Sequence, residues 1–300
     1  MQDLQNIKRK IDSAEDLLSV ASTMKSMAAV NVRQYEEAVS SLVDYRQTVE
    51  LGLQVVLRQS PGLLESAAES ERRNAGIVVF GSDHGMCGSF NERIRDFTLR
   101  WIGARDIPLD SLVAMTVGHR IAVQLDEEQI ALDTHLDVPA SVDGVTSFVD
   151  DVLLALDDWR QRQAVDHIWL LFNQTTGPST FTPTDNALLP IDRPWLEHID
   201  RRQWPSRVLP TTRMPPEELF SSLIREHLFI TIFRACCESL AAENAARLNS
   251  MQSAERNIEE RLEELTADYR RTRQSAITAE LLDIVSGYEA LMGEDEDEPT

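Results

Sequence analysis

Residues 241–276 have the sequence AAENAARLNSMQSAERNIEERLEELTADYRRTRQSA, which contains neither proline nor glycine. Apolar side chains recur along it at steps of three, four or seven residues, and Glu255 and Thr272 interrupt the series. The series consists of Leu248, Met251, Ile258, Leu262, Leu265, Tyr269 and Ala276. This period predicts a long helix that buries one side against another helix, because a single helix cannot cover such a stripe alone.

A second stripe begins the chain. Every seventh residue from Leu4 to Val39, and every seventh from Ile7 to Leu42, is apolar except Lys25. The two stripes predict an antiparallel coiled coil of the two chain ends. Two ordinary amphipathic helices folded onto a central domain are the alternative. Helices of this length overhang any core that about half the chain can build, which favours the coiled coil.

The middle of the chain has a different composition. Eleven of the twelve prolines lie between Pro61 and Pro216, and glycines bound short apolar runs there. Three runs predict buried strands, at 77–80, 112–117 and 167–172, and helical periodicity lies between them at 89–102 and 145–160. Alternating strands and helices predict an α/β domain with a largely parallel sheet. The stretch 174–215, rich in proline and threonine, predicts loops with one or two edge strands.

These patterns predict four segments. They are an N-terminal coiled-coil helix at 1–60, an α/β domain at 61–215, a C-terminal coiled-coil helix at 216–292 and an acidic tail at 293–300. We expect the tail to stay solvated and disordered, because like charges repel one another.

Charge and cysteine content exclude several classes of protein. The formal net charge of -21 argues against nucleic acid or an anionic membrane as a direct partner. No apolar run is long enough to cross a bilayer and no signal peptide is evident, so we expect a soluble cytosolic protein without membrane insertion. Cys87, Cys236 and Cys237 form no CxxC pair, which predicts free thiols and no metal site.

One segment could carry chemistry. Gly81–Asn91, GSDHGMCGSFN, follows a predicted strand and opens a helix, the usual place for a phosphate-binding loop. Its glycines fit neither GxGxxG nor GxxxxGK[ST], so a tight strand-to-helix turn is the favoured interpretation. Adjacency of Asp83, His84 and Cys87 does not establish a catalytic triad. We predict no catalytic, cofactor-binding or metal-binding residues, and keep a Rossmann-type nucleotide-binding protein as the alternative.

Three segments, in order along the chain, resemble the gamma subunit of F-type ATP synthases. The closest likeness is the C-terminal run from 241 to 287, the signature helix of that family. The other two are 23–33, TMKSMAAVNVR, and the turn at 81–91. The resemblance spans nearly the whole chain and implies an antiparallel coiled coil of both termini with an inserted Rossmann-like domain.

The resemblance also implies a function. A gamma subunit is the central stalk that rotates within a hexamer of alpha and beta subunits and couples ion flow through the membrane c-ring to ATP chemistry on the beta subunits. The implied partners are the alpha, beta and epsilon subunits and the c-ring. The implied location is the cytoplasmic face of a bacterial-type membrane, and the chain itself would not be catalytic. A coiled-coil scaffold unrelated to ATP synthase is a further alternative.

Matching the motifs places five residues at contacts with beta subunits. Met24 and Lys25 match the short helix, and Arg273, Gln274 and Thr278 match the facing stretch of the long helix. The residues alone favour a different interpretation, in which Lys25 extends to water and Arg273 lies on a solvated face.

Two features depart from the family. Asn31 and Gln34 stand where basic residues are usual, and the acidic tail extends past the usual end of the chain. They indicate a divergent member.

Overall fold

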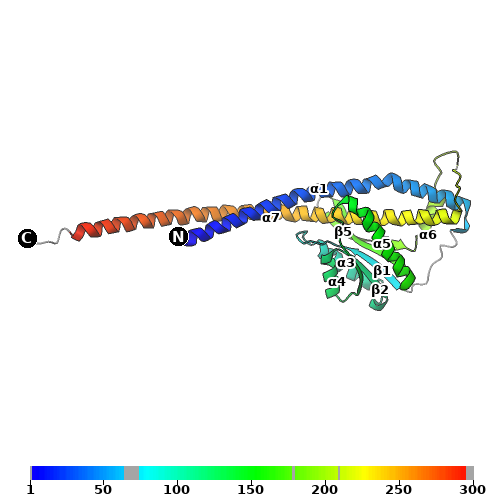
Figure 1. Cartoon of the computed structure of the whole chain (residues 1–300), viewed down its shortest axis with the longest axis horizontal. Helices are drawn as coiled ribbons and strands as arrows, with labels where there is room; N and C mark the ends of the chain where they lie inside the picture. Colours follow the sequence, from blue (N-terminus) through cyan, green and yellow to red (C-terminus); the bar gives the residue numbers. More distant parts are fainter. Residues whose placement is uncertain (1, 64–73, 178–179, 209, 295–300) are drawn as a thin grey trace, which may run out of the picture. The chain divides into compact units, whose positions relative to one another are not determined.

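The computed structural model describes residues 2–63, 74–177, 180–208 and 210–294 (Figure 1). The chain divides into two compact units. The smaller unit comprises residues 1–26 and 251–300, and the larger comprises residues 27–250. The predicted acidic tail lies, from residue 295 onward, outside the described residues.

The larger unit contains a five-stranded sheet. Its strands are β1 (Asn74–Phe80), β2 (Leu112–Val117), β3 (Leu132–Leu136), β4 (Val165–Gly177) and β5 (Thr180–Leu189). Their order is β3-β2-β1-β4-β5; the first four are parallel and β5 is antiparallel to β4. The predicted largely parallel sheet is therefore confirmed.

The described α-helices are α1 (Gln2–Gln59), α3 (Phe90–Ala104), α4 (His119–Glu127), α5 (Val142–Arg162), α6 (Arg193–Arg201) and α7 (Pro216–Glu294). Some of them cover the two faces of the sheet, and α6 packs against α1 and α7. Side chains of α5 and α7 pack on one face, joined there by Tyr35 and Ala38 of α1. Side chains of α3 and α4 pack on the other face. The elements form the predicted mixed α/β fold.

The sequence missed three elements of the larger unit: β3, α4 and α6. Each is short, and β3 alternates half-buried and exposed residues. Side-chain hydrogen bonds hold β3 against α5, since Trp159 Nε1 and Gln163 Nε2 donate to Asp133 at 2.7 and 2.8 Å. Burial would raise the pKa of Asp133, but these bonds and one from Thr134 outweigh it and lower the pKa. Periodicity cannot detect a strand that is held in this way.

The paired helices follow the predicted stripes in each unit. In the larger unit, Asn31 bonds to Asn244 and Tyr45 bonds to Glu226, so residue numbers rise along α1 as they fall along α7. The helices are therefore antiparallel there. In the smaller unit, Ala21, Met251 and Leu265 are buried, and other positions of the two stripes are half-buried.

At the carboxyl end of the sheet, the backbone of Gly118 lies very close to the backbone of Ser82. Gly118 has φ +104°, and a Cβ there would lie 2.7 Å from the backbone of Ser82. Gly81 is equally confined, because its Cβ would lie 2.4 Å from Ile121. At position 118, only glycine can adopt this positive φ and also leave room for the Ser82 backbone.

We predict that Gly118→Ala lowers the free energy of unfolding by about 2 kcal/mol or more, because it combines a strained φ with a backbone clash. Chemical denaturation of the full chain measures the loss. Gly103→Ala is the matched control, because this helical glycine has open space around it. The free energy of unfolding of the control variant should rise by about 0.5 kcal/mol. Equal effects of the two changes would contradict the packing described.

Candidate functional site

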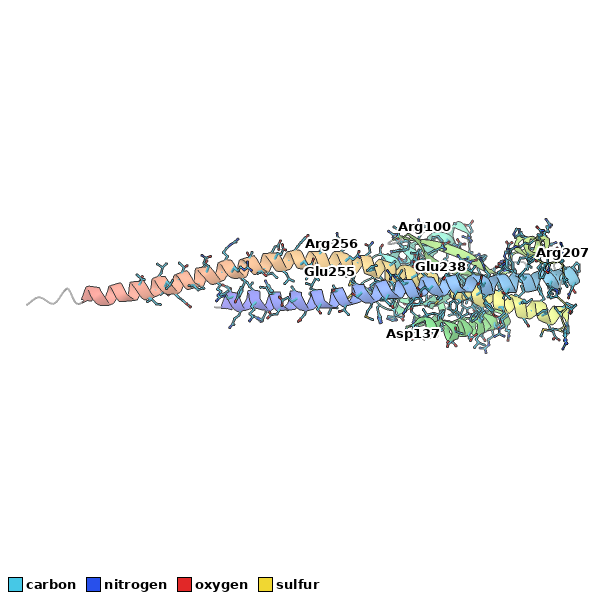
Figure 2. All side chains as sticks on the ribbon, turned by 90° about the horizontal axis from the view of Figure 1, so that it is seen from above. Arg100, Asp137, Arg207, Glu238, Glu255 and Arg256 are labelled. Carbon is cyan, nitrogen blue, oxygen red and sulfur yellow. The ribbon has the colours of Figure 1, made fainter. Side chains whose placement is uncertain are left out.

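The charged residues that interrupt the two apolar stripes pair with each other in the smaller unit. Lys25 Nζ donates to Glu255 Oε2 at 2.5 Å, and the side chains are 30% and 20% exposed. Figure 2 shows Glu255 on the side of α7 that faces α1. The Lys25 amine is held within the chain, whereas the sequence suggested either extension into water or contact with a partner.

The other predicted contact residues lie apart from Lys25. Arg273, Gln274 and Thr278 are exposed on successive turns of α7, where Thr278 Oγ1 donates to the Gln274 carbonyl at 2.9 Å. From Glu255 to Arg273 the helix advances about 27 Å, at about 1.5 Å per residue. The expectation that this group faces Met24 and Lys25 is wrong, because the stretch of α7 facing Lys25 is the one around Glu255.

Sequence reasoning missed an apolar surface on the same helix. From 277 to 286 every residue of α7 is exposed. The large apolar side chains among them are Ile277, Leu281, Leu282, Ile284 and Val285, between 48% and 69% exposed. Concentrated exposed apolar surface of this kind marks an interaction site. The signal available in the sequence was the apolar content of a stretch that lies beyond the last position of the stripe.

The turn at 81–91 is filled by side chains of the turn itself. The Ser82 N–H donates to Asn91 Oδ1 at 3.1 Å, and Asn91 Nδ2 donates to Ser82 Oγ at 2.8 Å. Cys87 and Phe90 pack against Phe181 and two alanines of α7. Burial raises the pKa of the Cys87 thiol, so this cysteine is a poor nucleophile. All three cysteines are free, as predicted, and all three are buried.

Asp83 occupies the place where α/β folds bind ligands, beyond the carboxyl ends of parallel strands. Its Oδ1 accepts from the N–H of His119, after β2, and its Oδ2 accepts from the N–H of Val138, after β3; both distances are 2.9 Å. Backbone donors that could hold a phosphate are thus bound to the chain's own carboxylate. The nucleotide-binding alternative is not supported.

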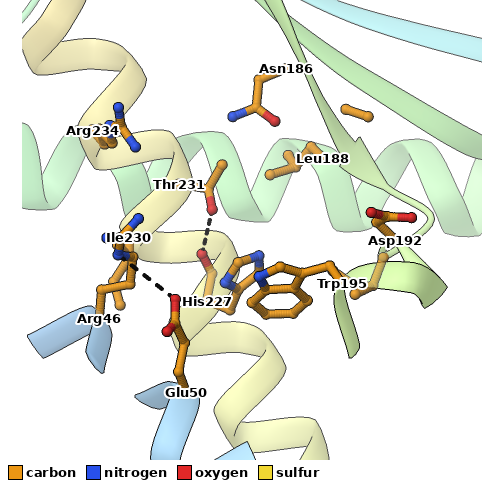
Figure 3. Close-up of a pocket in the computed structure, with 12 residues that line it drawn as sticks. Arg46, Glu50, Asn186, Leu188, Asp192, Trp195, His227, Ile230, Thr231 and Arg234 are labelled. Atoms are coloured by element: carbon orange, nitrogen blue, oxygen red, sulfur yellow. Dashed lines mark hydrogen bonds and ion pairs between the residues drawn. The ribbon is translucent and has the colours of Figure 1, made fainter. Parts of the chain in front are cut away.

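A hollow of about 260 Å³ lies in the larger unit between α1, β5, α6 and α7 (Figure 3). Trp195 packs against His227 with ring centroids 4.1 Å apart and the rings tilted by 33°, and Leu188 and Ile230 line the apolar part. Arg46 lies 3.8 Å from Glu50, and Arg234 lies 2.6 Å from Glu238. With both arginines already paired, the described residues that line the hollow offer no free cation to hold an anion. Among the described residues no cluster of three or more potential metal ligands occurs.

Comparison with known proteins agrees with these features. A family model described as ATP synthase matches residues 3–291. The ATP synthase gamma chain of Syntrophus aciditrophicus is 29% identical over 292 residues, covering 97% of this chain and 99% of that one. The gamma chain of Geotalea uraniireducens is 28% identical over 298 residues, covering 98% and 100%.

Solved structures share the fold. A chain of the Euglena gracilis mitochondrial ATP synthase superposes with a TM-score of 0.66 at 15% identity, covering 100% of this chain and 98% of that one. A chain of the Tetrahymena thermophila central stalk and c-ring gives 0.57 at 17% identity, covering 78% and 99%.

Two long helices that pair antiparallel beside an α/β sheet are typical of a stalk-type subunit. The match over nearly the full length assigns it further: the chain belongs to the family of ATP synthase gamma subunits, which form the central stalk.

We predict that Asp83→Asn lowers the free energy of unfolding by about 2 kcal/mol. The amide retains only one acceptor oxygen, and a charged hydrogen bond contributes roughly 1.5–3 kcal/mol. Denaturation of the full chain measures the change, with Asp110→Asn as the control at an exposed site. Unchanged stability of Asp83→Asn would contradict the role given to this carboxylate.

His227 should make stability depend on pH. Burial, and secondarily Arg46, lower its pKa to about 4 from 6.5. Between these pH values the unfolded chain binds a proton that the folded chain does not, so the free energy of unfolding falls as pH drops through the window. Between pH 7 and pH 4.5, the free energy of unfolding of His227→Gln should therefore fall by about 2 kcal/mol less than that of the wild type. His198→Gln, at an exposed position of α6, is the control and should keep the wild-type pH profile.

Proposed function

We propose that this chain is the rotating shaft of an F-type ATP synthase, which turns within a ring of alternating alpha and beta subunits. Ion flow through a membrane ring would turn the shaft, and the shaft would drive the beta subunits through their nucleotide-binding states. The observation that supports this most is the full-length family match on a chain whose two ends pair as long helices. The chain would transmit force without carrying out the chemistry.

The exposed apolar surface of α7 supports contact with a partner subunit. Ile277, Leu281, Leu282, Ile284 and Val285 are exposed and lie within roughly 160° of the helix circumference. A partner in the assembled complex covers a broad apolar face of this kind. Apolar contact is also compatible with rotation, because it is not directional.

Polar contacts with beta subunits are proposed at residues that remain exposed. Arg273, Gln274 and Thr278 on α7 offer a fixed charge, an amide and a hydroxyl. Met24 on α1 is half-buried and adds an adaptable apolar contact. Lys25 belonged to the same predicted set. Because it is bonded to Glu255, it would act by positioning the two helices and not by direct contact with a beta subunit.

Further partners follow from the family and from the similar structures. The Tetrahymena structure contains the central stalk with its c-ring, and the Euglena structure contains F1 with its c-ring. We place this chain on a membrane ring, together with an epsilon subunit, at the cytoplasmic face of a bacterial-type membrane. Within the described part of the chain no helix has the length and apolarity needed to span a bilayer.

Copurification tests the proposal. The tagged chain, expressed in its own host, should bring down alpha and beta subunits in equal numbers in a complex that hydrolyses ATP. A chain that stays monomeric, or that is recovered with other proteins only, would refute the assignment.

We predict that replacing Arg273 and Gln274 together by Ala lowers the turnover of the assembled complex several-fold without unfolding the chain. Both side chains are exposed, so their removal leaves no cavity. ATP hydrolysis per complex and circular dichroism of the free chain give the two readouts. Gln252→Ala with Arg256→Ala is the matched control, an exposed Gln and Arg about five to six turns away on the same helix. Unchanged turnover would remove Arg273 and Gln274 from the contact set.

A further inference from the structure

We propose that the Lys25–Glu255 ion pair fixes the axial register of α1 against α7, and that both residues are positioning residues. They are the charged members of two otherwise uncharged stripes, and the structure joins them at 2.5 Å. A single polar position in a coiled-coil seam is known to specify register, at a cost in stability.

The rest of the stripe in the smaller unit carries little register information. Ile7, Ile11 and Leu18 on α1 are interchangeable aliphatic side chains, as are Ile258 and Leu262 on α7. Apolar contacts of similar size tolerate exchange, and a stripe with a seven-residue period matches itself again after a shift of seven residues. Such a shift moves one helix by about 10 Å along the other.

The ion pair penalises these shifted alignments. A shift in one direction places Lys25 opposite Leu262, and a shift in the other places Glu255 opposite Leu18. Each shift leaves two charges partly buried without a partner, which is far more costly than the pair itself. The native alignment is the one in which the two charges meet.

The consequence for function rests on the proposed function. The register decides at what height the outer side of α1, with Met24, is presented relative to Arg273 on α7. A shaft that can slip would present the two surfaces at variable positions and transmit torque less faithfully. The register itself is a property of the isolated chain and can be tested there.

Electron spin–spin distances on the isolated full-length chain measure the register directly. Ser19→Cys and Ser275→Cys place labels at exposed positions of α1 and α7, and the three native cysteines are buried. With Lys25 opposite Glu255, the labelled positions are offset by about 20 Å along the axis. We expect one narrow distance distribution for the wild-type sequence.

Three variants separate register from mere stability. K25M with E255L should remain helical and melt no lower than wild type, but its distribution should broaden or acquire populations shifted by up to about 10 Å. K25E with E255K restores the pair in reverse and should restore the single narrow distribution. R261M with E264L removes an exposed ion pair of α7 and should leave the distribution unchanged. A single wild-type distance in K25M with E255L would overturn the proposal, as would failure of the charge exchange to restore it.

A second readout concerns the assembled complex. K25M with E255L should retain ATP hydrolysis but move fewer ions per ATP, and K25E with E255K should recover the wild-type ratio. If the chain enters no ATP synthase complex, the proposed function fails while the distance measurement stands. If the complex assembles and the distances do not respond, only the positioning role fails.

Discussion

The structure depends on the need of two long helices to bury an apolar stripe that neither can cover alone. Residues 241–276 and the first forty residues carry the stripes, and each unit closes them as a helix pair. Burial of apolar surface drives the two helices together. It does not fix the axial alignment of one helix against the other, since one aliphatic contact resembles another. Polar bonds across the pair supply the position, as for Lys25 with Glu255 in the smaller unit and Asn31 with Asn244 in the larger.

The sequence predicted what depends on composition and period. Short apolar runs located β1, β2 and β4, and the absence of proline located the long helices. The sequence could not predict which residues of the two helices lie opposite each other, because a repeating apolar pattern does not define the alignment of one helix against another. Lys25 and Glu255 were therefore recognised only as separate interruptions of two stripes. Nor could it predict β3, whose attachment depends on Asp133 accepting bonds from a helix that follows it in the chain.

The turn at 81–91 shows a different limit of sequence reasoning. Its position between β1 and α3 is that of a phosphate-binding loop, and the glycine spacing alone argued against one. The structure adds the physical cause, because Asp83 binds the backbone donors after β2 and β3 while Gly118 brings the backbone onto Ser82. An α/β domain can thus keep its fold and lose its ligand when a carboxylate of the chain satisfies the donors.

Asn31 follows the same logic as the ion pair. A lysine at this position would extend its charge to the surface. Asn31 instead donates to Asn244 at 3.2 Å, and Asn244, which is 4% exposed, also bonds to the Leu240 carbonyl. A buried amide without a partner is costly, so this pair disfavours misaligned helices as the ion pair does. Asn31 therefore forms a specific bond between the helices, which favours a helix pair of defined alignment.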